Sequence, residues 1–160
     1  MYALNRNELQ AKVAVILGRV SSKPQEDGYS IDGQVNKGRE YCKRKGLTVI
    51  QEYTFHESST RGNRPKFFEM IKFIKKQKEP VALICDKVDR LQRGFKEAPI
   101  IEELRKSGKL EIHLITENQV LHQNSTSQEL MMYNVFVMMA QSYTDSLSDN
   151  INRSHQEMIK

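Results

Sequence analysis

The sequence predicts an α/β domain: a mainly parallel sheet of four to five strands covered by helices, followed by a long C-terminal helix. Short apolar runs alternate with helical patterns over residues 13–115, and this alternation favours parallel strands joined by helical crossovers. Residues 81–85 are apolar throughout, which is typical of a strand buried on both faces. A chain of 160 residues has the size of one ordinary domain with its own core.

The first part of the chain predicts a strand, a helix and a second strand. Residues 13–17 are apolar and rich in β-branched side chains, so they form a short buried strand. Ser30 is a typical N-cap, and we expect a helix over residues 31–45 that ends at Gly46. The second strand is expected over residues 47–55.

The middle of the chain predicts a loop, two helices and further strands. Residues 56–63 are polar without periodicity and predict a loop. A helix over 65–78 begins with a proline, which suits a first helical turn. A second helix over 96–106 stops at Gly108, and residues 110–115 give the strand after 81–85. The apolar residues expected on the buried face of the helix 65–78 are Phe68, Ile71 and Ile74.

The last third predicts one long helix, because residues 127–158 contain neither proline nor glycine. A heptad seam runs along it, with members at alternating spacings of three and four, and we expect it to be the oligomer interface. The seam comprises Leu130, Tyr133, Val137, Ala140, Thr144 and Leu147. A second apolar set comprises Met131, Val135, Phe136, Met138 and Met139. A helix that is apolar on two sides packs on its own sheet and on a partner subunit; the alternative is a central core helix in a monomer.

The net charge is +5, and most of the basic excess lies in residues 37–45 and 61–78. Such clustering favours a polyanionic partner, with merely solvated helix faces as the alternative. No apolar run approaches the roughly 18 residues of a membrane helix, and the first ten residues lack the apolar core of a signal peptide. These features favour a protein of the cytoplasm that does not enter a membrane.

Several classes of site are disfavoured by the spacing of reactive residues. Cys42 and Cys85 lie far apart without a CxxC context, which favours buried, reduced thiols. The four histidines have no metal-ligand spacing, and there is no GxxxxGK[ST] loop for a nucleotide phosphate. A receiver domain would carry acidic residues at the end of its first strand, where this chain has Arg19 and Ser21. We therefore expect neither a metal nor a cofactor.

The exit of the first strand is the candidate site, because ligands of open α/β sheets bind at the carboxyl ends of the strands. There the chain reads Gly18-Arg19-Val20-Ser21-Ser22. No histidine or carboxylate accompanies the serines, and a serine beside a fixed cation suits a phosphate better than a carbonyl. Taken alone, the two serines would be interpreted as turn or cap residues.

Four segments in order resemble the catalytic domain of serine site-specific recombinases, the resolvase/invertase family. They are Gly18-Arg19-Val20-Ser21-Ser22 with Gln25, Gly28-Tyr29-Ser30-Ile31-Asp32-Gly33-Gln34, Arg64-Pro65, and Asp89-Arg90-Leu91-Gln92-Arg93. The sequences of the second and third segments are most similar to those of large serine recombinases and related transposases. The resemblance extends over about residues 13–155. His56-Glu57 departs from the Asp-containing segment that many relatives have there.

The resemblance implies a resolvase-like fold and cleavage of DNA by a serine hydroxyl. Ser21 would be the nucleophile, forming a 5′-phosphoserine and releasing a 3′-hydroxyl, and the linkage would conserve the bond energy without ATP or metal. Asp89 would either orient an arginine or accept the serine proton. The implied phosphate-binding cations are Arg19, Arg64, Arg90 and Arg93, and the implied positioning amides are Gln25 and Gln34.

The implied partners are double-stranded DNA and further copies of the chain, as a homodimer and as a tetramer in the synaptic complex. We expect an N-terminal extension over 1–12, the α/β catalytic domain over 13–126, and the oligomerisation helix over 127–160, with a separate DNA-binding domain absent from this chain. Such a protein would act in a bacterial cell, encoded by the cell, a phage or a mobile element. The alternative is a resolvase-like domain without catalysis that acts in dimerisation or in regulation of a DNA-binding partner.

Overall fold

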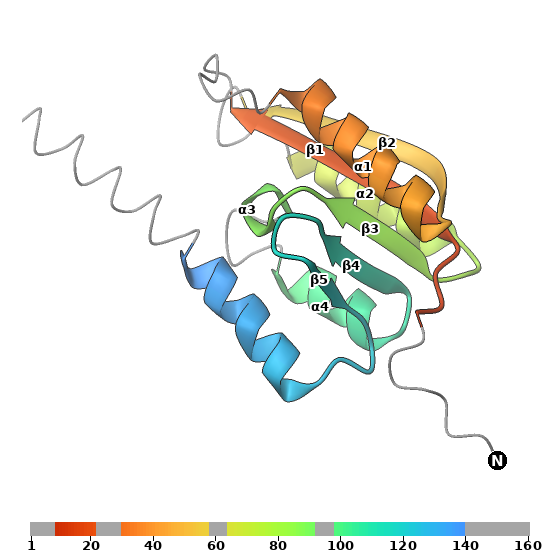
Figure 1. Cartoon of the computed structure of the whole chain (residues 1–160). Helices are drawn as coiled ribbons and strands as arrows, with labels where there is room; N and C mark the ends of the chain where they lie inside the picture. The colour runs from red at the N-terminus through yellow and green to blue at the C-terminus, as the bar shows by residue number, and fades with distance from the viewer. Residues whose placement is uncertain (1–8, 22–29, 58–63, 92–97, 140–160) are drawn as a thin grey trace, which may run out of the picture.

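The computed structural model describes residues 9–21, 30–57, 64–91 and 98–139. These residues include a five-stranded sheet of order β2-β1-β3-β4-β5, in which β1 pairs in parallel with β2 and β3, and β3 with β4 (Figure 1). Only β5 is antiparallel, along β4. The predicted α/β class with a mainly parallel sheet is therefore confirmed. The strands are β1 (Val13–Ser21), β2 (Thr48–Glu57), β3 (Val81–Cys85), β4 (Leu110–Leu114) and β5 (Gln119–Leu121).

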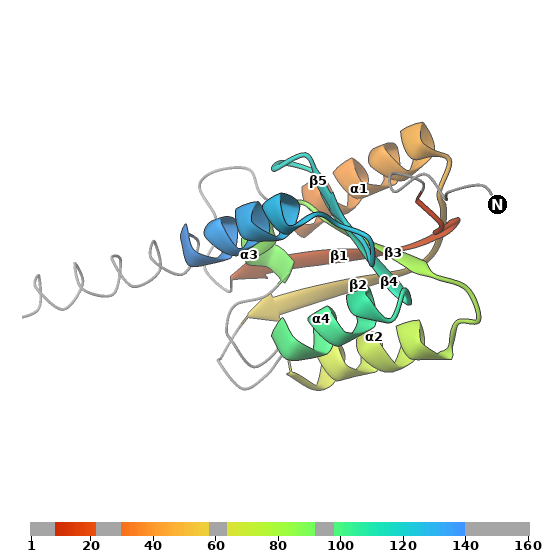
Figure 2. The ribbon, with the colours of Figure 1, turned by 90° about the horizontal axis from the view of Figure 1, so that it is seen from below.

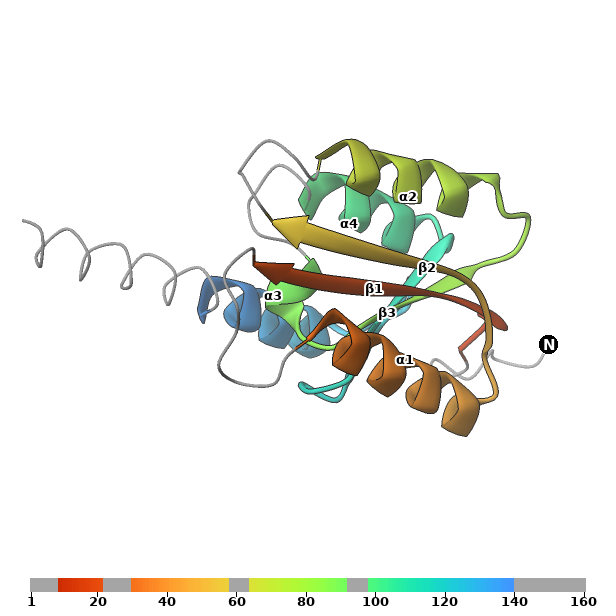
Figure 3. The ribbon, with the colours of Figure 1, turned by 90° about the horizontal axis from the view of Figure 1, so that it is seen from above.

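Helices cover both faces of the sheet. Figures 2 and 3 show α1 on one face and both α2 and α4 on the opposite face. The helices are α1 (Ile31–Lys45), α2 (Arg64–Lys76), α3 (Val88–Leu91) and α4 (Ala98–Lys106). Residues 127–139 are also helical and are drawn in blue near α3 in Figure 1. The rest of the predicted long helix lies outside the described residues. In the described part of the chain, no helix combines the length and the apolar character needed to cross a membrane.

Helix α1 has the predicted bounds because both of its ends are set by local chemistry. The Ser30 hydroxyl accepts a hydrogen bond from the main-chain N–H of Gly33 at 3.0 Å. Gly46 ends the helix in the left-handed region, at φ +71°, where a side chain would be strained. Within the helix, a Cβ on Gly38 would lie 3.0 Å from Cγ2 of Ile16. A glycine at that position therefore lets α1 approach β1 closely.

Two apolar clusters form the core, one on each face of the sheet. Under α1, Ala14 and Ile16 of β1 pack with Val35 and Cys42. The larger cluster on the opposite face includes residues of α2, α4 and the helix 127–139: Phe67, Met70, Ile71, Ile74, Ile101, Leu104 and Tyr133. The expectation for Phe68 is wrong, because this side chain is 49% exposed and the neighbouring Phe67 is buried.

The three described members of the heptad seam are covered by the core of the chain itself, so the expected contact with a partner does not hold for these three. Tyr133 is only 7% exposed, and Leu130 and Val137 pack against the same core cluster. These three side chains form the side of the helix that packs against the core cluster, which also contains Leu121 of β5. The exposed apolar residues of this helix are instead Met131, Met132, Val135, Met138 and Met139. Ala140, Thr144 and Leu147 lie outside the described residues.

Strand β2 is longer than predicted. It pairs with β1 as far as Ser21↔Glu57, so His56 and Glu57 belong to the sheet and not to a loop. The polar character of these residues suggested a loop, but their main-chain groups pair with the extended end of β1. The remaining residues of the predicted loop, 58–63, lie outside the described residues.

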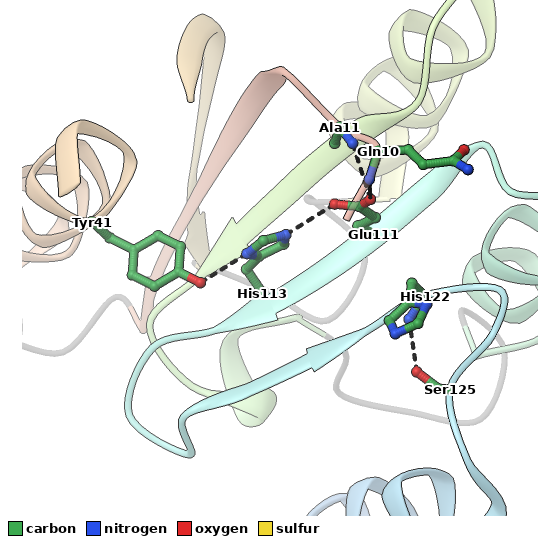
Figure 4. Close-up of polar contacts among 7 residues, drawn as sticks. All are labelled: Gln10, Ala11, Tyr41, Glu111, His113, His122 and Ser125. Atoms are coloured by element: carbon green, nitrogen blue, oxygen red, sulfur yellow. Dashed lines mark hydrogen bonds and ion pairs between the residues drawn. The ribbon is translucent and has the colours of Figure 1, made fainter. Parts of the chain in front are cut away.

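A buried polar chain lies toward the amino ends of the strands (Figure 4). The carboxylate of Glu111 accepts hydrogen bonds from the main-chain N–H groups of Gln10 at 2.6 Å and Ala11 at 3.0 Å. Its second oxygen lies 3.3 Å from Nε2 of His113, and Nδ1 of His113 lies 2.8 Å from the Tyr41 hydroxyl. All of these contacts are satisfied when Nε2 of His113 donates to Glu111 and Nδ1 accepts from the Tyr41 hydroxyl. These hydrogen bonds attach the segment around Gln10 and Ala11 to β4.

Candidate functional site

The order of the strands places a topological switch point at the carboxyl ends of β1 and β3. Strand β2 lies on one side of β1, whereas β3 and β4 follow on the other side. The direction in which strands are added therefore reverses between β1 and β3. Ligands of open α/β sheets bind in the crevice outside such a switch point. The motif that carries Arg19 and Ser21 therefore ends at the position the fold favours for a ligand.

Strand β1 extends past β3 at this edge. Its pairing with β3 stops at Leu17↔Cys85, whereas its pairing with β2 continues to Ser21↔Glu57. Glu57, whose role the sequence left open, is thus the register partner of Ser21. The last four residues of β1 have a neighbouring strand on one side only, so the other side is open toward the switch point.

Gln34 occupies this open side with its amide. Its Oε1 accepts from the main-chain N–H of Arg19 at 3.0 Å, and its Nε2 donates to the main-chain oxygen of Arg19, also at 3.0 Å. The side chain is 3% exposed and replaces the ladder that β3 no longer provides. Gln34 therefore fixes the main chain of β1 two residues before Ser21, which is a positioning role.

The other two motif segments begin at the same edge. Helix α3 directly follows β3 and contacts β1, and it includes Asp89 and Arg90 (Figure 3). Helix α2 follows β2 and begins at Arg64. For Ser21, Arg64, Asp89 and Arg90 the structure describes the main chain only. Gln25, Ser22 and Arg93 lie outside the described residues.

Two carboxylates near the exit of β3 were missed by the sequence reasoning. Asp86 directly follows β3, and Glu117 lies in the turn between β4 and β5. Asp86 is 2% exposed and its Oδ1 accepts from Lys37 Nζ at 2.7 Å and from Thr116 Oγ1 at 3.0 Å. Glu117 Oε1 accepts from the main-chain N–H of Val88 at 3.1 Å. Within the described part of the chain, the other oxygens of both carboxylates are buried without a hydrogen-bond partner. No motif marks these residues, because their partners come from distant elements.

The two cysteines are not candidates for the nucleophile. Both are free and buried. Burial raises the pKa of Cys42 to about 11. Burial, together with the nearby carboxylates of Glu117 and Asp86, raises the pKa of Cys85 as well. Both thiols are protonated at neutral pH and therefore unreactive. Among the described residues, no group of three or more His, Cys, Asp or Glu side chains is placed to hold a metal ion.

Structural comparison finds similar folds among recombinase catalytic domains. The N-terminal catalytic domain of TP901-1 integrase is 20% identical, with a TM-score of 0.60 over 84% of this chain and 98% of that chain. A resolvase family site-specific recombinase from Streptococcus pneumoniae is 21% identical, with a TM-score of 0.55 over 92% and 96% of the two chains. The C-terminal catalytic domain of ISC1926 TnpA, an IS607-like serine recombinase, is 21% identical, with a TM-score of 0.53 over 87% and 98%.

The comparison of sequences is consistent with this fold. A search of curated proteins finds no match. The family model described as "Resolvase, N terminal domain" matches residues 14–160, which is nearly the whole chain. The switch-point edge, with its serine and arginine motifs in the order that the sequence predicts, lies within that match. The chain therefore belongs to the resolvase N-terminal domain family.

Proposed function

We propose that this chain is the catalytic domain of a DNA site-specific recombinase that cleaves and rejoins DNA through a 5′-phosphoserine intermediate. The observation that carries the proposal is the convergence of three motif segments on one edge of the sheet. The end of β1 carries Ser21, α3 carries Arg90, and α2 begins at Arg64. The neighbouring structures that share this fold are named as an integrase, a resolvase family site-specific recombinase and a serine recombinase.

In the proposed reaction, the Ser21 hydroxyl attacks a phosphodiester phosphorus. The new bond joins Oγ to phosphorus and the bond from phosphorus to O3′ breaks. The serine proton passes to a base, and the departing O3′ takes up a proton from a general acid or from water, so that it leaves as a hydroxyl. Asp89 is one candidate for that base, and Glu57, the register partner of Ser21, is another. Rejoining is the reverse reaction and consumes no ATP, because the phosphoester bond is kept.

The proposal assigns stabilisation of the phosphate to arginines. A guanidinium presents two parallel donors that fit two phosphate oxygens, and donors already in place stabilise the charge that develops in the transition state. Gln34 and Gln25 are assigned to positioning, of which the Gln34 contact with Arg19 is the described part. The assigned arginines are Arg19, Arg64, Arg90 and Arg93.

The proposed partners are double-stranded DNA and a second copy of the chain. The outer side of the helix 127–139 exposes Met131 to 64%, Met138 to 68% and Met139 to 61%. Exposed apolar clusters of this kind mark protein interfaces. We assign this side to the homodimer, and to the tetramer of the synaptic complex, in place of the inward seam.

The test is the search for a denaturant-resistant adduct of protein and DNA. The chain, or the longer protein that contains it, is incubated with overlapping duplex fragments of the DNA flanking its own gene. Wild type is compared with Ser21→Ala and Ser22→Ala. We expect an adduct that retains a label from the 3′ end of the cleaved strand, while the other piece ends in an extendable 3′-hydroxyl.

Each outcome assigns the chemistry. Loss of the adduct in Ser21→Ala alone supports Ser21 as the nucleophile, and loss in Ser22→Ala alone shifts the role by one residue. No adduct from any version, on DNA that is shown to be bound, contradicts the proposal. That result favours a resolvase-like domain that acts in dimerisation or regulation without catalysis.

A further inference from the structure

We propose that the turn between β4 and β5, together with Lys37, positions the segment that carries Arg90, and that Glu117 is the central positioning residue. The inference rests on the proposed function, which assigns Arg90 to the DNA phosphate. It adds residues outside the four motif segments: Lys37, Asp86, Thr116 and Glu117. None of them is assigned a contact with DNA.

The turn is attached to the exit of β3 through its main chain. The N–H of Ile115 donates to the oxygen of Cys85 at 3.0 Å, and the N–H of Thr116 donates to the oxygen of Asp86 at 2.9 Å. Pairing with the β3 side therefore continues two residues beyond the end of β4. Asn118 then reverses the chain at φ +52°, and its N–H donates to the oxygen of Ile115 at 3.2 Å. Glu117 is held inside this closed turn.

Glu117 caps the first residue of α3. Its Oε1 accepts from the main-chain N–H of Val88 at 3.1 Å. The first N–H groups of a helix have no partner within the helix, and a helix of four residues is too short to be stable by itself. Val88 and Leu91 are buried and anchor the underside of α3. The cap and the two apolar anchors together fix the turn on which Arg90 stands.

Asp86 fixes the start of the segment, two residues before Val88. Lys37 Nζ donates to Asp86 Oδ1 at 2.7 Å and to Thr116 Oγ1 at 3.3 Å, so α1, the exit of β3 and the β4–β5 turn meet at one carboxylate. Gln34 stands one helical turn before Lys37 and holds Arg19. Two residues of α1, the buried Gln34 and the partly exposed Lys37, thus contact both strand exits that flank the switch point.

A residue that positions an arginine changes the rate constant and leaves DNA affinity largely unchanged. A displacement of about 1 Å at the reacting groups can cost about a hundredfold in rate. In Glu117→Gln the amide oxygen still accepts from Val88, whereas in Glu117→Leu nothing does. The pair therefore separates the hydrogen bond from the shape of the side chain. Glu103→Leu, at an exposed glutamate of α4, is the matched control.

The first measurement is the single-turnover rate of adduct formation at saturating DNA, on the fragment that the wild type cleaves. We expect Glu117→Leu to be slower by about tenfold to a hundredfold. Lys37→Met is expected to be slowed in the same direction, and Glu117→Gln to stay within about threefold of wild type. DNA affinity stays within about twofold, because phosphate contacts on the protein surface dominate it. A merely structural role lowers the amplitude, which reports the folded fraction, and leaves the rate constant of the folded molecules unchanged.

The second measurement does not depend on activity. Hydrogen exchange followed by NMR reports whether the Val88 amide is protected. We expect protection in wild type and Glu117→Gln, and loss of protection in Glu117→Leu while the amides of β3 stay protected. A Val88 amide that remains protected in Glu117→Leu, or a folded Glu117→Leu with the wild-type rate, overturns the inference. A wild type that forms no adduct contradicts the proposed function instead, and Val88 exchange still decides the positioning contact.

Discussion

The two edges of the sheet each hold buried carboxylates, but they use them differently. At the amino edge, both oxygens of Glu111 have partners, and Tyr41 completes the chain through His113 (Figure 4). At the carboxyl edge, Asp86 and Glu117 each use one oxygen, and within the described residues the second oxygen of each is buried without a partner. At the amino edge every carboxylate oxygen of the network is hydrogen-bonded. At the carboxyl edge, among the described residues, half of the carboxylate oxygens of Asp86 and Glu117 are not.

The difference separates stability from chemistry. Buried polar groups that are fully paired fix a structure, whereas an unpaired buried acceptor costs stability and is retained where something else is gained. The motif segments begin at the edge where, among the described residues, one oxygen each of Asp86 and Glu117 is buried without a hydrogen-bond partner. We therefore expect substitutions at the carboxyl edge to change the reaction and substitutions at the amino edge to change the free energy of unfolding.

Removing one arginine at the carboxyl edge is expected to give the largest effect on the reaction rate. Arg90→Ala should slow adduct formation by about a hundredfold or more, because a preorganised donor to the phosphate is lost. The measurement is the single-turnover rate on the DNA that wild type cleaves. Arg44→Ala, at an exposed residue in the last turn of α1, is the control and should keep the wild-type rate. Equal rates for the two variants would remove the distinction between the edges.

The amino edge is tested by Glu111→Gln, which should lower the free energy of unfolding by about 2 kcal/mol at neutral pH without slowing adduct formation. Burial alone would raise the pKa of Glu111, but hydrogen bonds from His113, Ala11 and Gln10 bring this pKa below its ordinary value. The stabilisation is therefore present above the unfolded pKa of about 4.3 and is lost as the pH falls through the lower folded pKa.

Urea unfolding at several pH values checks this prediction. The gap between wild type and Glu111→Gln should be largest near pH 7 and should shrink as the pH falls below about 4. A gap that grows in acid would show that the sign is reversed. A variant of unchanged stability would show that the buried network contributes nothing.

Gln34→Glu is expected to change both the stability and the reaction rate, because Gln34 is buried and also fixes the main chain near Ser21. A glutamate keeps the size of the side chain but cannot donate to the main-chain oxygen of Arg19, so one buried hydrogen bond is lost. We expect a loss of about 1 to 2 kcal/mol in stability and a slower reaction. Unfolding curves and single-turnover rates are measured together, and a change in stability alone would make Gln34 purely structural.

The smallest effect on stability is expected on the outer side of the helix 127–139. Met138→Asp should change the free energy of unfolding by no more than about 0.5 kcal/mol, because the side chain is 68% exposed. It should weaken self-association in sedimentation experiments, since the charge would be buried in the dimer. Phe68→Asp, at an exposed apolar residue of α2, is the control. Unchanged association in Met138→Asp would leave the interface without support.

Sequence reasoning located the elements whose ends are set by local chemistry. Helix α1 was predicted to its exact bounds because Ser30 and Gly46 are local signals, and β3 was predicted because an apolar run needs no context. Strand β5 and helix α3 are too short for periodicity to reveal. Strand β5 pairs with β4, and α3 is capped by Glu117 and anchored by the buried Val88 and Leu91. The side of the helix 127–139 that faces the sheet depends on the shape of the core, which periodicity alone does not give.

The same distinction applies to the site. The motifs predicted which segments meet, and the main chain of β1, α2 and α3 brings those segments to one edge. The roles of Ser21 and the arginines stay predictions. Asp86 and Glu117 escaped the sequence analysis because their partners are 29 or more positions away in the chain: Lys37 and Thr116 for Asp86, and Val88 for Glu117. Only the folded sheet brings such residues together.

The most direct test of the central claim is to map the residue that carries DNA. The adduct is digested with nuclease and protease, and mass spectrometry with fragmentation locates the nucleotide within the peptide that contains Ser21 and Ser22. We predict a nucleotide joined through its 5′ phosphate to Ser21. A nucleotide on any other residue, or one joined through its 3′ phosphate, would contradict it.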